Sequence, residues 1–480
     1  MSKTYVGSRL RQLRGERGLS QQTMARTLGI SASYLNQMEH DSRPLTASVL
    51  GRISEVFGID IGFFDPQDDV RLIAELREAL LDEDLDAHPS ASDPAEISAM
   101  VAGHRTMAEA MAHLHRRYRL VSEQLAAVTA GRGDPGLRGT TSAPHEEVRH
   151  FFSNHRNYFH DLDVAAEELT SRMRMNSVDI RTGLADRMSQ VHGVHIDRRV
   201  DLGDNVLHRF DAKNRRLDFA ASLSIGQRSF RIAAELGYLE HGDLIDALVD
   251  DGAFTTEDAA TLARHGLANY FAGAAVLPYA QFHGAAEDFR YDIERLSAFY
   301  TVSYETVCHR LSTLQRPNLR GVPWTFVRID RAGNMSKRQS ATSFHFSASG
   351  GTCPLWNVYE TFGSPGKILT QITEMPDGRE YFWISRTVER RAARYGQSPK
   401  TFAIGMGCEL RQADRVVYSD GLELGPQART TPIGAGCRVC DRRGCAQRAF
   451  PPLGTSLAID EHRSTVSPYM IVPAPDAGRG

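Results

Sequence analysis

The chain has 480 residues, of which 41% are hydrophobic and 24% are charged, and its formal net charge is −3. A chain of this length is too long for one hydrophobic core, so we expect two to four domains. The small net charge argues against a protein that coats nucleic acid over its whole surface, but it allows one small basic module. No apolar run approaches the roughly 18 residues of a membrane span, and the N-terminus has no apolar signal core, so we expect a cytoplasmic protein.

The first 144 residues predict helices separated by short breaks. Residues 1–65 predict four or five short helices punctuated by glycine, and residues 68–86 predict an acidic amphipathic helix. After a break that contains two prolines, residues 95–130 predict one long helix, and a Gly/Pro-rich linker extends to residue 144. The apolar residues of the long helix lie on one face, which is a candidate dimer contact: Met100, Met107, Met111, Leu114 and Leu120.

The remaining residues change from helical to strand-like patterning. Residues 145–320 are mainly helical, with one short strand near Leu217–Leu223. From Val322 onward, polar and apolar residues alternate between Gly and Asn turns, which predicts an antiparallel α+β domain reaching about residue 472. The predicted strand segments are Thr325–Ile329, Ser343–Phe346 and Tyr381–Ser385.

Residues 19–39 predict two capped helices joined by a tight turn. Ser20 caps the first helix, Ser31 caps the second, and Gly29 supplies the turn between them. The inward positions at helical spacing are Met24, Ala25, Leu28, Leu35 and Met38. The first 45 residues hold seven Lys or Arg against three acids, so this module is locally basic. A helical bundle without a DNA role is the alternative interpretation.

The exposed start of the second capped helix carries small, hydroxyl and amide side chains. Such side chains suit entry into the major groove, where amides bond base edges. The stretch resembles the phage-repressor type of helix-turn-helix in the xenobiotic-response-element-like regulators. The resemblance implies that Ser31, Ala32, Ser33 and Gln37 read bases, that Gln21 and Arg43 contact phosphate, and that Arg14 pairs with Glu39 in a structural role.

Residues 229–238 have the frame of His-Glu-x-x-His, the zinc-protease motif in which two histidines bind zinc and the glutamate is the base. Ala234 and Tyr238 occupy the histidine positions, and only Glu235 remains. Residues 267–278 resemble the Glu-Ala-Asn-x-Phe-Ala segment of anti-repressor proteases, with Leu267 in place of the acidic ligand. A carboxylate without metal cleaves no peptide, so we expect a degenerate protease domain and no enzyme. An unrelated helical domain is the alternative.

A former catalytic cleft of this kind is a candidate binding site for a small ligand. Tyr238 and Tyr270 supply partly apolar lining, and Arg198 and Arg209 are candidates to meet phosphates or a carboxylate. Surface solvation is the commoner fate of any one arginine.

Three cysteines within nine residues form the second strong signal. Cys437 and Cys440 share a Cys-x2-Cys turn, and Cys445 returns as a third ligand. The surrounding arginines are expected to lower the thiol pKa values and to offset thiolate charge. Cys408 is the first choice for a fourth ligand and Cys353 is the second. Zinc and an iron–sulfur cluster both fit such ligands, and an unmetallated thiol switch or plain structural cysteines remain as alternatives.

The order of these parts, together with Arg310–Pro317, Cys353–Val358 and Glu461–Pro468, resembles the short-chain fatty acyl regulator family over nearly the whole chain. The resemblance implies a regulator of short-chain fatty acid, acetate and glyoxylate-cycle genes that senses CoA or acyl-CoA in its middle domain. It also implies an iron–sulfur cluster, of the 4Fe-4S type, on Cys408, Cys437, Cys440 and Cys445.

We therefore expect a multidomain, mainly α protein that binds double-stranded operator DNA as a homodimer or higher homo-oligomer, because one such module reads only a few base pairs. The runner-up is a phage- or antitoxin-type repressor whose protease-like domain binds a protein partner. The expected domains are a helix-turn-helix (1–67), a helical linker (68–144), a degenerate zinc-protease-like α+β domain (145–321) and a C-terminal α+β domain with the cysteine site (322–480).

Overall fold

The computed structural model of the chain describes residues 7–40, 42–57, 67–82, 94–129, 144–174, 179–199, 202–203, 206–342, 344, 352–390, 399–442, 444–451, 457–458, 462, 466 and 470–471. The chain divides into two compact units. Unit 1 contains Met1–Arg138, Ser343–Cys353 and Gly434–Gly480, and unit 2 contains Gly139–Thr342 and Pro354–Ile433. Unit 2 thus joins the predicted protease-like domain to much of the predicted C-terminal domain, whereas the cysteine-rich segment belongs to unit 1. The four predicted domain limits stay predictions.

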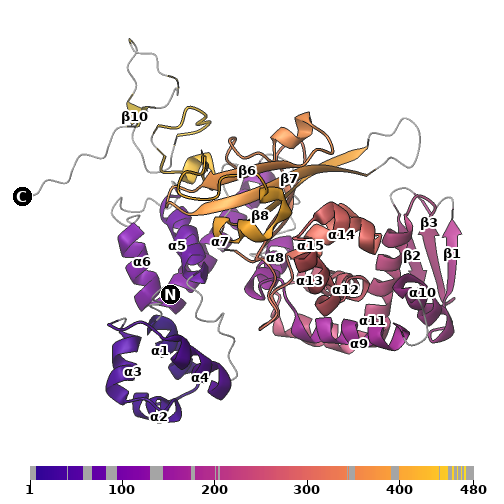
Figure 1. The fold of residues 1–480 in the computed structure, drawn as a ribbon, viewed down its shortest axis with the longest axis horizontal. Coiled ribbons are helices and arrows are strands. Elements are labelled where there is room, and N and C mark those ends of the chain that lie inside the picture. Colours follow the sequence, from indigo (N-terminus) through magenta and orange to yellow (C-terminus); the bar gives the residue numbers. More distant parts are fainter. Residues whose placement is uncertain are drawn as a thin grey trace, which may run out of the picture. The chain divides into compact units, whose positions relative to one another are not determined.

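Four short helices open unit 1 and surround a small core (Figure 1, indigo). They are α1 (Gly7–Glu16), α2 (Gln21–Thr27), α3 (Ala32–Glu39) and α4 (Ala47–Phe57). The core residues are the expected inward ones with helical spacing, Met24, Ala25, Leu28, Leu35 and Met38, joined by Leu10, Leu13, Leu45, Val49 and Ile53. The prediction of short helices is confirmed for the described residues, and residues 58–66 lie outside them.

A second group of three helices follows in unit 1: α5 (Gln67–Leu80), α6 (Pro94–Gly103) and α7 (Arg105–Thr129). The predicted single helix over 95–130 is wrong, because the chain leaves the helical conformation at His104, next to Gly103. Glycine weakens a helix interior, and the break lets α6 and α7 both pack on α5. The shared core consists of Leu72, Leu76, Ile97, Val101, Ala108 and Ala112.

The break also divides the predicted apolar face. Met100 packs partly against the shared core, whereas Met107 and Leu114 on α7 are 69% and 68% exposed. The side chain of Leu120 lies outside the described residues. Two short strands, β10 (Leu457–Ala458) and β11 (Met470–Ile471), pair antiparallel in the C-terminal part of unit 1.

Helices make up the first part of unit 2, with a small sheet inserted among them (Figure 1). The helices are α8 (Pro144–Asn154), α9 (His160–Arg174), α10 (Ile180–Gln190), α11 (Ile225–Asp251), α12 (Glu257–Val276), α13 (Tyr279–Asp288), α14 (Ile293–Tyr300) and α15 (Tyr304–Leu311). Helix α11 begins with a capping box, in which Ser224 and Gln227 each bond the other's backbone amide.

The small sheet has the order β1-β3-β2, with strands His195–Arg199, Arg216–Ala220 and His208–Asp211 in that order. The predicted strand near residues 217–223 corresponds to β3 and is confirmed. The outer strands β1 and β2 escaped prediction because they are short, half-exposed and rich in charged residues, so they show no apolar alternation.

A six-stranded sheet with the order β5-β4-β8-β7-β6-β9 completes unit 2. The neighbouring strands are antiparallel except for β6 and β9. The strands are β4 (Thr325–Ile329), β5 (Met335–Ser340), β6 (Leu369–Glu374), β7 (Glu380–Arg390), β8 (Lys400–Glu409) and β9 (Thr431–Pro432). Three short 3-10 helices also belong to unit 2: η4 (Glu360–Gly363), η5 (Leu410–Arg415) and η6 (Val417–Ser419). A fourth, η7 (Cys437–Val439), belongs to unit 1. The predicted strands at 325–329 and 381–385 are confirmed. The predicted strand at 343–346 lies outside the described residues apart from Phe344, which is not in a strand.

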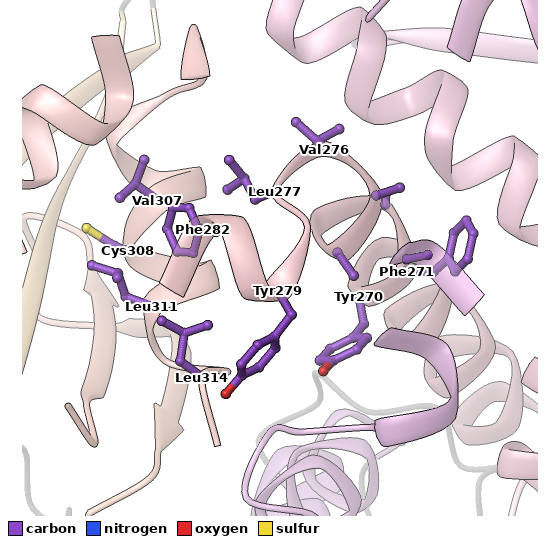
Figure 2. Packing of buried hydrophobic residues seen from close by; sticks show 14 of the residues in the cluster. Tyr270, Phe271, Val276, Leu277, Tyr279, Phe282, Val307, Cys308, Leu311 and Leu314 are labelled. Carbon is purple, nitrogen blue, oxygen red and sulfur yellow. The ribbon is translucent and has the colours of Figure 1, made fainter. Parts of the chain in front are cut away.

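One continuous hydrophobic cluster runs from Phe151 to Val416 and joins the helices of unit 2 to its large sheet. Figure 2 shows part of it, where residues of α12, α13 and α15 and of the segment after α15 meet. Cys308 is fully buried here, and burial raises its pKa. Among the described residues, no helix is long and apolar enough to cross a membrane.

A buried ion pair lies within this cluster. The Nη2 of Arg310 donates to Asp163 Oδ1 at 2.5 Å, and the side chains are 2% and 0% exposed. The Tyr270 hydroxyl donates to the other carboxylate oxygen at 2.6 Å, and Arg310 Nε donates to the Leu277 carbonyl at 3.0 Å. Burial alone would lower the pKa of Arg310, but the Asp163 charge more than offsets this and raises it. The pair therefore ties together α9, α12 and α15.

Replacing Arg310 by Met should destabilise unit 2 by about 3–5 kcal/mol, because Asp163 would keep a buried charge without its cation. Urea unfolding followed by tryptophan fluorescence measures this, since all three tryptophans, Trp324, Trp356 and Trp383, lie in unit 2. Arg290→Met, which breaks the exposed pair with Asp420, is the control and should change the stability far less, because solvent screens an exposed pair. Equal losses in the two variants would contradict the assigned role.

Candidate functional site

The helix-turn-helix is set by two serine caps and one glycine. The Thr23 amide donates to Ser20 Oγ at 3.1 Å, and the Tyr34 amide donates to Ser31 Oγ at 3.1 Å, so α2 and α3 begin where the sequence predicts. Gly29 has φ +64°, a left-handed conformation that glycine adopts without strain. The caps and the turn thus fix the direction in which α3 leaves α2.

A polar contact across the module holds α3 against α1. Arg14 Nε donates to Glu39 Oε1 at 2.7 Å, and Glu39 is almost fully buried. Gln21 Nε2 donates to Glu39 Oε2 at 2.8 Å and to Asn36 Oδ1 at 3.0 Å. The expected Arg14–Glu39 pair is confirmed. Gln21, expected to touch phosphate, uses its amide nitrogen inside the module, and its phosphate role stays a prediction.

The expected base-reading residues lie together on the first two turns of α3. Ser31 and Ser33 are exposed, Gln37 is half-buried, and Ala32 packs partly against the module core. Beyond the end of the helix, the exposed Arg43 guanidinium lies 5.6 Å from the centre of the Tyr34 ring. The Gln37 carbonyl accepts the amides of Ser42 and Arg43, which holds the Arg43 segment beside α3. The geometry therefore presents serines, an amide and a cation on one end of the module.

The zinc-protease frame lies on α11, where Gly237 lets α12 approach closely: a Cβ on Gly237 would lie 2.9 Å from Phe271 Cδ1. Ala234 and Leu267 are buried and carry no ligand atom. The Glu235 carboxylate is 3.2 Å from His208 Nε2, on β2. His208 was missed because it precedes Glu235 by 27 residues, and only the packing of the small sheet on α11 brings them together.

The two expected ligand-binding tyrosines have different surroundings. Tyr238 is half-buried, with its hydroxyl 3.4 Å from His265 Nδ1 and the Arg264 guanidinium 4.9 Å from its ring centre. Partial burial, and next the Glu235 charge, raise the pKa of Tyr238. Tyr270 is a buried core residue. Its hydroxyl donates to Asp163 and accepts a hydrogen bond from the Phe159 amide. Its hydroxyl thus already has two protein partners.

The two expected arginines lie on the small sheet and are exposed. Arg198 Nη2 donates to the Ala221 carbonyl at 2.6 Å, and Arg209 Nη2 donates to the Leu202 carbonyl at 3.3 Å. Their guanidinium groups keep further N–H donors, so an anionic ligand at either residue stays a prediction.

One buried arginine organises the segment from Gly434 to Phe450, which we call the cysteine loop. Arg448 is 5% exposed and donates to the carbonyls of Cys437, Cys440 and Arg442 at 2.9, 3.0 and 2.5 Å. Cys437 and Cys440 are buried, whereas Cys445 is partly exposed. The guanidinium thus places a positive charge beside backbone that carries two thiols.

The space around Cys440 is also fixed. A Cβ on Gly434 would lie 2.6 Å from Cys440 Sγ, so only glycine fits at this position without a shift of the loop. The expectation that arginines lower the thiol pKa is wrong for Cys440: burial raises its pKa and outweighs the charges of Arg448 and Arg442.

The expected fourth ligand belongs to the other unit. Cys408 lies on β8 opposite Phe382, is fully buried in unit 2, and has its pKa raised by burial. Cys353, the second choice, is buried and belongs to unit 1, as do the loop cysteines. Among the described residues, no three Cys, His, Asp or Glu side chains lie together as a metal-binding group.

Family models match three successive parts of the chain. Residues 10–64 match a helix-turn-helix, residues 189–312 match the IrrE N-terminal-like domain, and residues 313–469 match the C-terminal domain of the short-chain fatty acyl coenzyme A regulators. The order is the one expected from the motifs, and the middle match covers the degenerate protease frame.

Characterised relatives match over nearly the full length. The HTH-type transcriptional regulator RamB of Mycobacterium tuberculosis (strain H37Rv) is 65% identical over 98% of this chain and 99% of its own. The HTH-type transcriptional regulator PrpR of the same strain is 44% identical over 98% of this chain and 96% of its own. A solved structure of a Mycobacterium tuberculosis transcriptional regulator is 48% identical, with a TM-score of 0.66 over 68% of this chain and 99% of that chain. The chain therefore belongs to the short-chain fatty acyl coenzyme A regulator family, as a DNA-binding transcriptional regulator with an N-terminal helix-turn-helix.

Proposed function

We propose that this regulator controls short-chain fatty acid, acetate and glyoxylate-cycle genes in the bacterial cytoplasm, by binding operators through α3 in response to a CoA-type metabolite. The observation that carries the DNA-binding part is the capped start of α3, where Ser31, Ser33 and Gln37 lie together beside Arg43. The family membership supports the metabolite class.

Gln37→Ala should weaken operator binding by about 1–3 kcal/mol and leave random-sequence binding nearly unchanged, because an amide that bonds a base edge contributes only at the correct base. The substitution keeps the backbone carbonyl that accepts the Ser42 and Arg43 amides, so the fold of the module is preserved. Fluorescence anisotropy with the operator and a scrambled duplex measures both affinities.

Arg43→Ala is the matched comparison, since a phosphate contact contributes equally to all sequences. It should weaken both duplexes alike and reduce the salt dependence of binding by about one ion. Equal losses on both duplexes for Gln37→Ala would reject its base-reading role.

The effector site we propose is the former protease cleft near Glu235 and Tyr238, which no longer has the histidine ligands that zinc hydrolysis needs. A CoA-type ligand carries phosphates, and the exposed guanidinium groups of Arg198 and Arg209 supply cations on the neighbouring small sheet. A domain that kept the shape of a protease but lost its ligands would serve as a sensor and cleave no peptide.

Acetyl-CoA, propionyl-CoA or free CoA should raise the melting temperature of unit 2, followed through its tryptophans. A ligand at 100 times its Kd stabilises the state that binds it by about 2.7 kcal/mol. Arg198→Ala together with Arg209→Ala should reduce the shift, whereas exposed Arg172→Ala on α9 is the control and should not. No shift with any of the three ligands would contradict CoA sensing.

We also propose an iron–sulfur cluster, of the 4Fe-4S type, on the cysteine loop. What supports the proposal is the chemistry of three thiols within nine residues, together with Arg448, which holds the backbone of Cys437 and Cys440 on one turn. Such a cluster would supply a redox-active centre when bound. Cys445 is the third ligand and Cys408 the proposed fourth, with Cys353 as the alternative and structural zinc as the alternative metal.

Anaerobically purified protein should absorb visible light, which zinc does not, and Cys440→Ser should remove that absorbance. Cys408→Ser should bleach it nearly as much, whereas Cys308→Ser, a change of an equally buried thiol in unit 2, should not. If Cys353→Ser removes the absorbance and Cys408→Ser does not, the fourth ligand is Cys353 and not Cys408. A colourless protein with stoichiometric zinc would reject the cluster.

The oligomer we propose is a homodimer through α7. Its apolar residues at 107, 111, 114 and 121 are exposed, and together with the half-buried Tyr118 they follow a 4-3-4-3 spacing, the pattern of a coiled-coil seam. Ala108 and Ala112 face the core shared with α5 and α6. Leu114→Lys should convert dimer to monomer in sedimentation experiments, and His113→Lys, off the stripe, should not. A wild-type monomer at micromolar concentration with and without operator would contradict the dimer.

A further inference from the structure

An ion pair joins the cysteine loop to α5 within unit 1. Both terminal nitrogens of Arg77, on α5, donate to the two carboxylate oxygens of Asp441, on the loop. The contact is bidentate and spans 364 residues of sequence, and the two side chains are 26% and 48% exposed. Bidentate guanidinium–carboxylate pairs fix orientation as well as distance.

Asp441 lies between two residues whose backbone Arg448 holds. The Arg448 guanidinium bonds the carbonyls of Cys440 and Arg442, on either side of Asp441. A change in the position of Cys440 therefore moves the Asp441 carboxylate, because the backbone that carries it is held on both sides. The ion pair thus reports the conformation of the thiol-bearing turn.

Helix α5 lies in the bundle that contacts the DNA-binding module. Its Leu72 and Leu76 are buried against α6 and α7, and α6 in turn contacts α1 of that module. The same bundle carries the apolar stripe of α7. A shift of α5 consequently acts on α6, which contacts α1, and on α7, the helix proposed to pair two copies.

We propose that the cysteine loop regulates DNA binding through α5, with Arg77 and Asp441 as the positioning residues that couple them. This inference rests on the proposed function of the loop as a thiolate site. When the loop is ordered, Asp441 holds Arg77 and α5 is fixed. When the thiol-bearing turn loosens, the pair breaks and α5 gains freedom to fray.

A double-mutant cycle in the full chain tests the coupling. Cys445→Ser perturbs the loop at its partly exposed cysteine, away from the ion pair, and Cys437→Ser is a second perturbation of the same kind. Hydrogen–deuterium exchange of the α5 amides is the readout, and it needs neither DNA nor a visible chromophore. Each loop variant should speed α5 exchange by about two- to fivefold, the size expected of one partly exposed ion pair.

In the Arg77→Ala background, Cys445→Ser should not speed α5 exchange any further, because the ion pair is already broken. The charge swap, Arg77→Asp with Asp441→Arg, should restore the effect of Cys445→Ser on α5 exchange, and that effect should shrink with rising salt. Arg71→Ala, which breaks a pair with Glu75 on the same helix, is the control and should leave the response intact. Additive effects of Cys445→Ser and Arg77→Ala, or no effect of either loop variant on α5, would overturn the coupling.

Operator titrations with the four proteins of the cycle, the wild type, Cys445→Ser, Arg77→Ala and the double variant, distinguish this inference from the proposed function. The operator affinities of the four proteins should show the same non-additivity as the α5 exchange rates. A full-length protein that binds no operator would reject the proposed function, while the exchange cycle would still decide whether the loop and α5 are coupled.

Discussion

Unit 2 depends on the buried pair of Arg310 and Asp163. Its helices and its large sheet share one apolar cluster, and the pair is a fully buried charge contact within that cluster. Apolar packing is not directional, but a charged carboxylate in such a core tolerates only an arrangement in which Arg310 and Tyr270 both reach it. The position of α12 relative to α9 and α15 is therefore specified by polar geometry as well as by hydrophobic burial.

This constraint explains how the domain survived the loss of its catalytic ligands. The scaffold contacts of α12 lie at Tyr270 and Phe271, whereas the positions that would ligate zinc, Ala234 and Leu267, are filled by apolar side chains that pack. The one remaining residue of the frame, Glu235, lies opposite His208 of the small sheet. Because the residues that stabilise the fold differ from those at the zinc-ligand positions, the ligand positions can change without loss of the fold.

In unit 1, the same division between frame and function recurs at smaller scale. Arg14 and Glu39 hold α3 from inside, while Ser31 and Ser33 are exposed and Gln37 is half-buried. In the cysteine loop, Arg448 bonds the backbone carbonyls of Cys437 and Cys440 and not their thiols. In each case a charged side chain orders the backbone or the helix that carries the candidate functional groups.

The sequence by itself determined whatever depends on residues close in the chain. Serine caps, a turn glycine and helical spacing specify the helix-turn-helix; alternation specifies β4 and β7; and three cysteines within nine residues specify the loop. Only the tertiary structure decided the break at His104, the partnership of His208 with Glu235, the core role of Tyr270, and the division that puts Cys408 in unit 2 and the loop in unit 1. The physical reason is distance along the chain. Caps, turns and helical spacing depend on interactions between neighbouring residues, whereas a contact such as Arg77 with Asp441 forms only after folding has brought separate segments together.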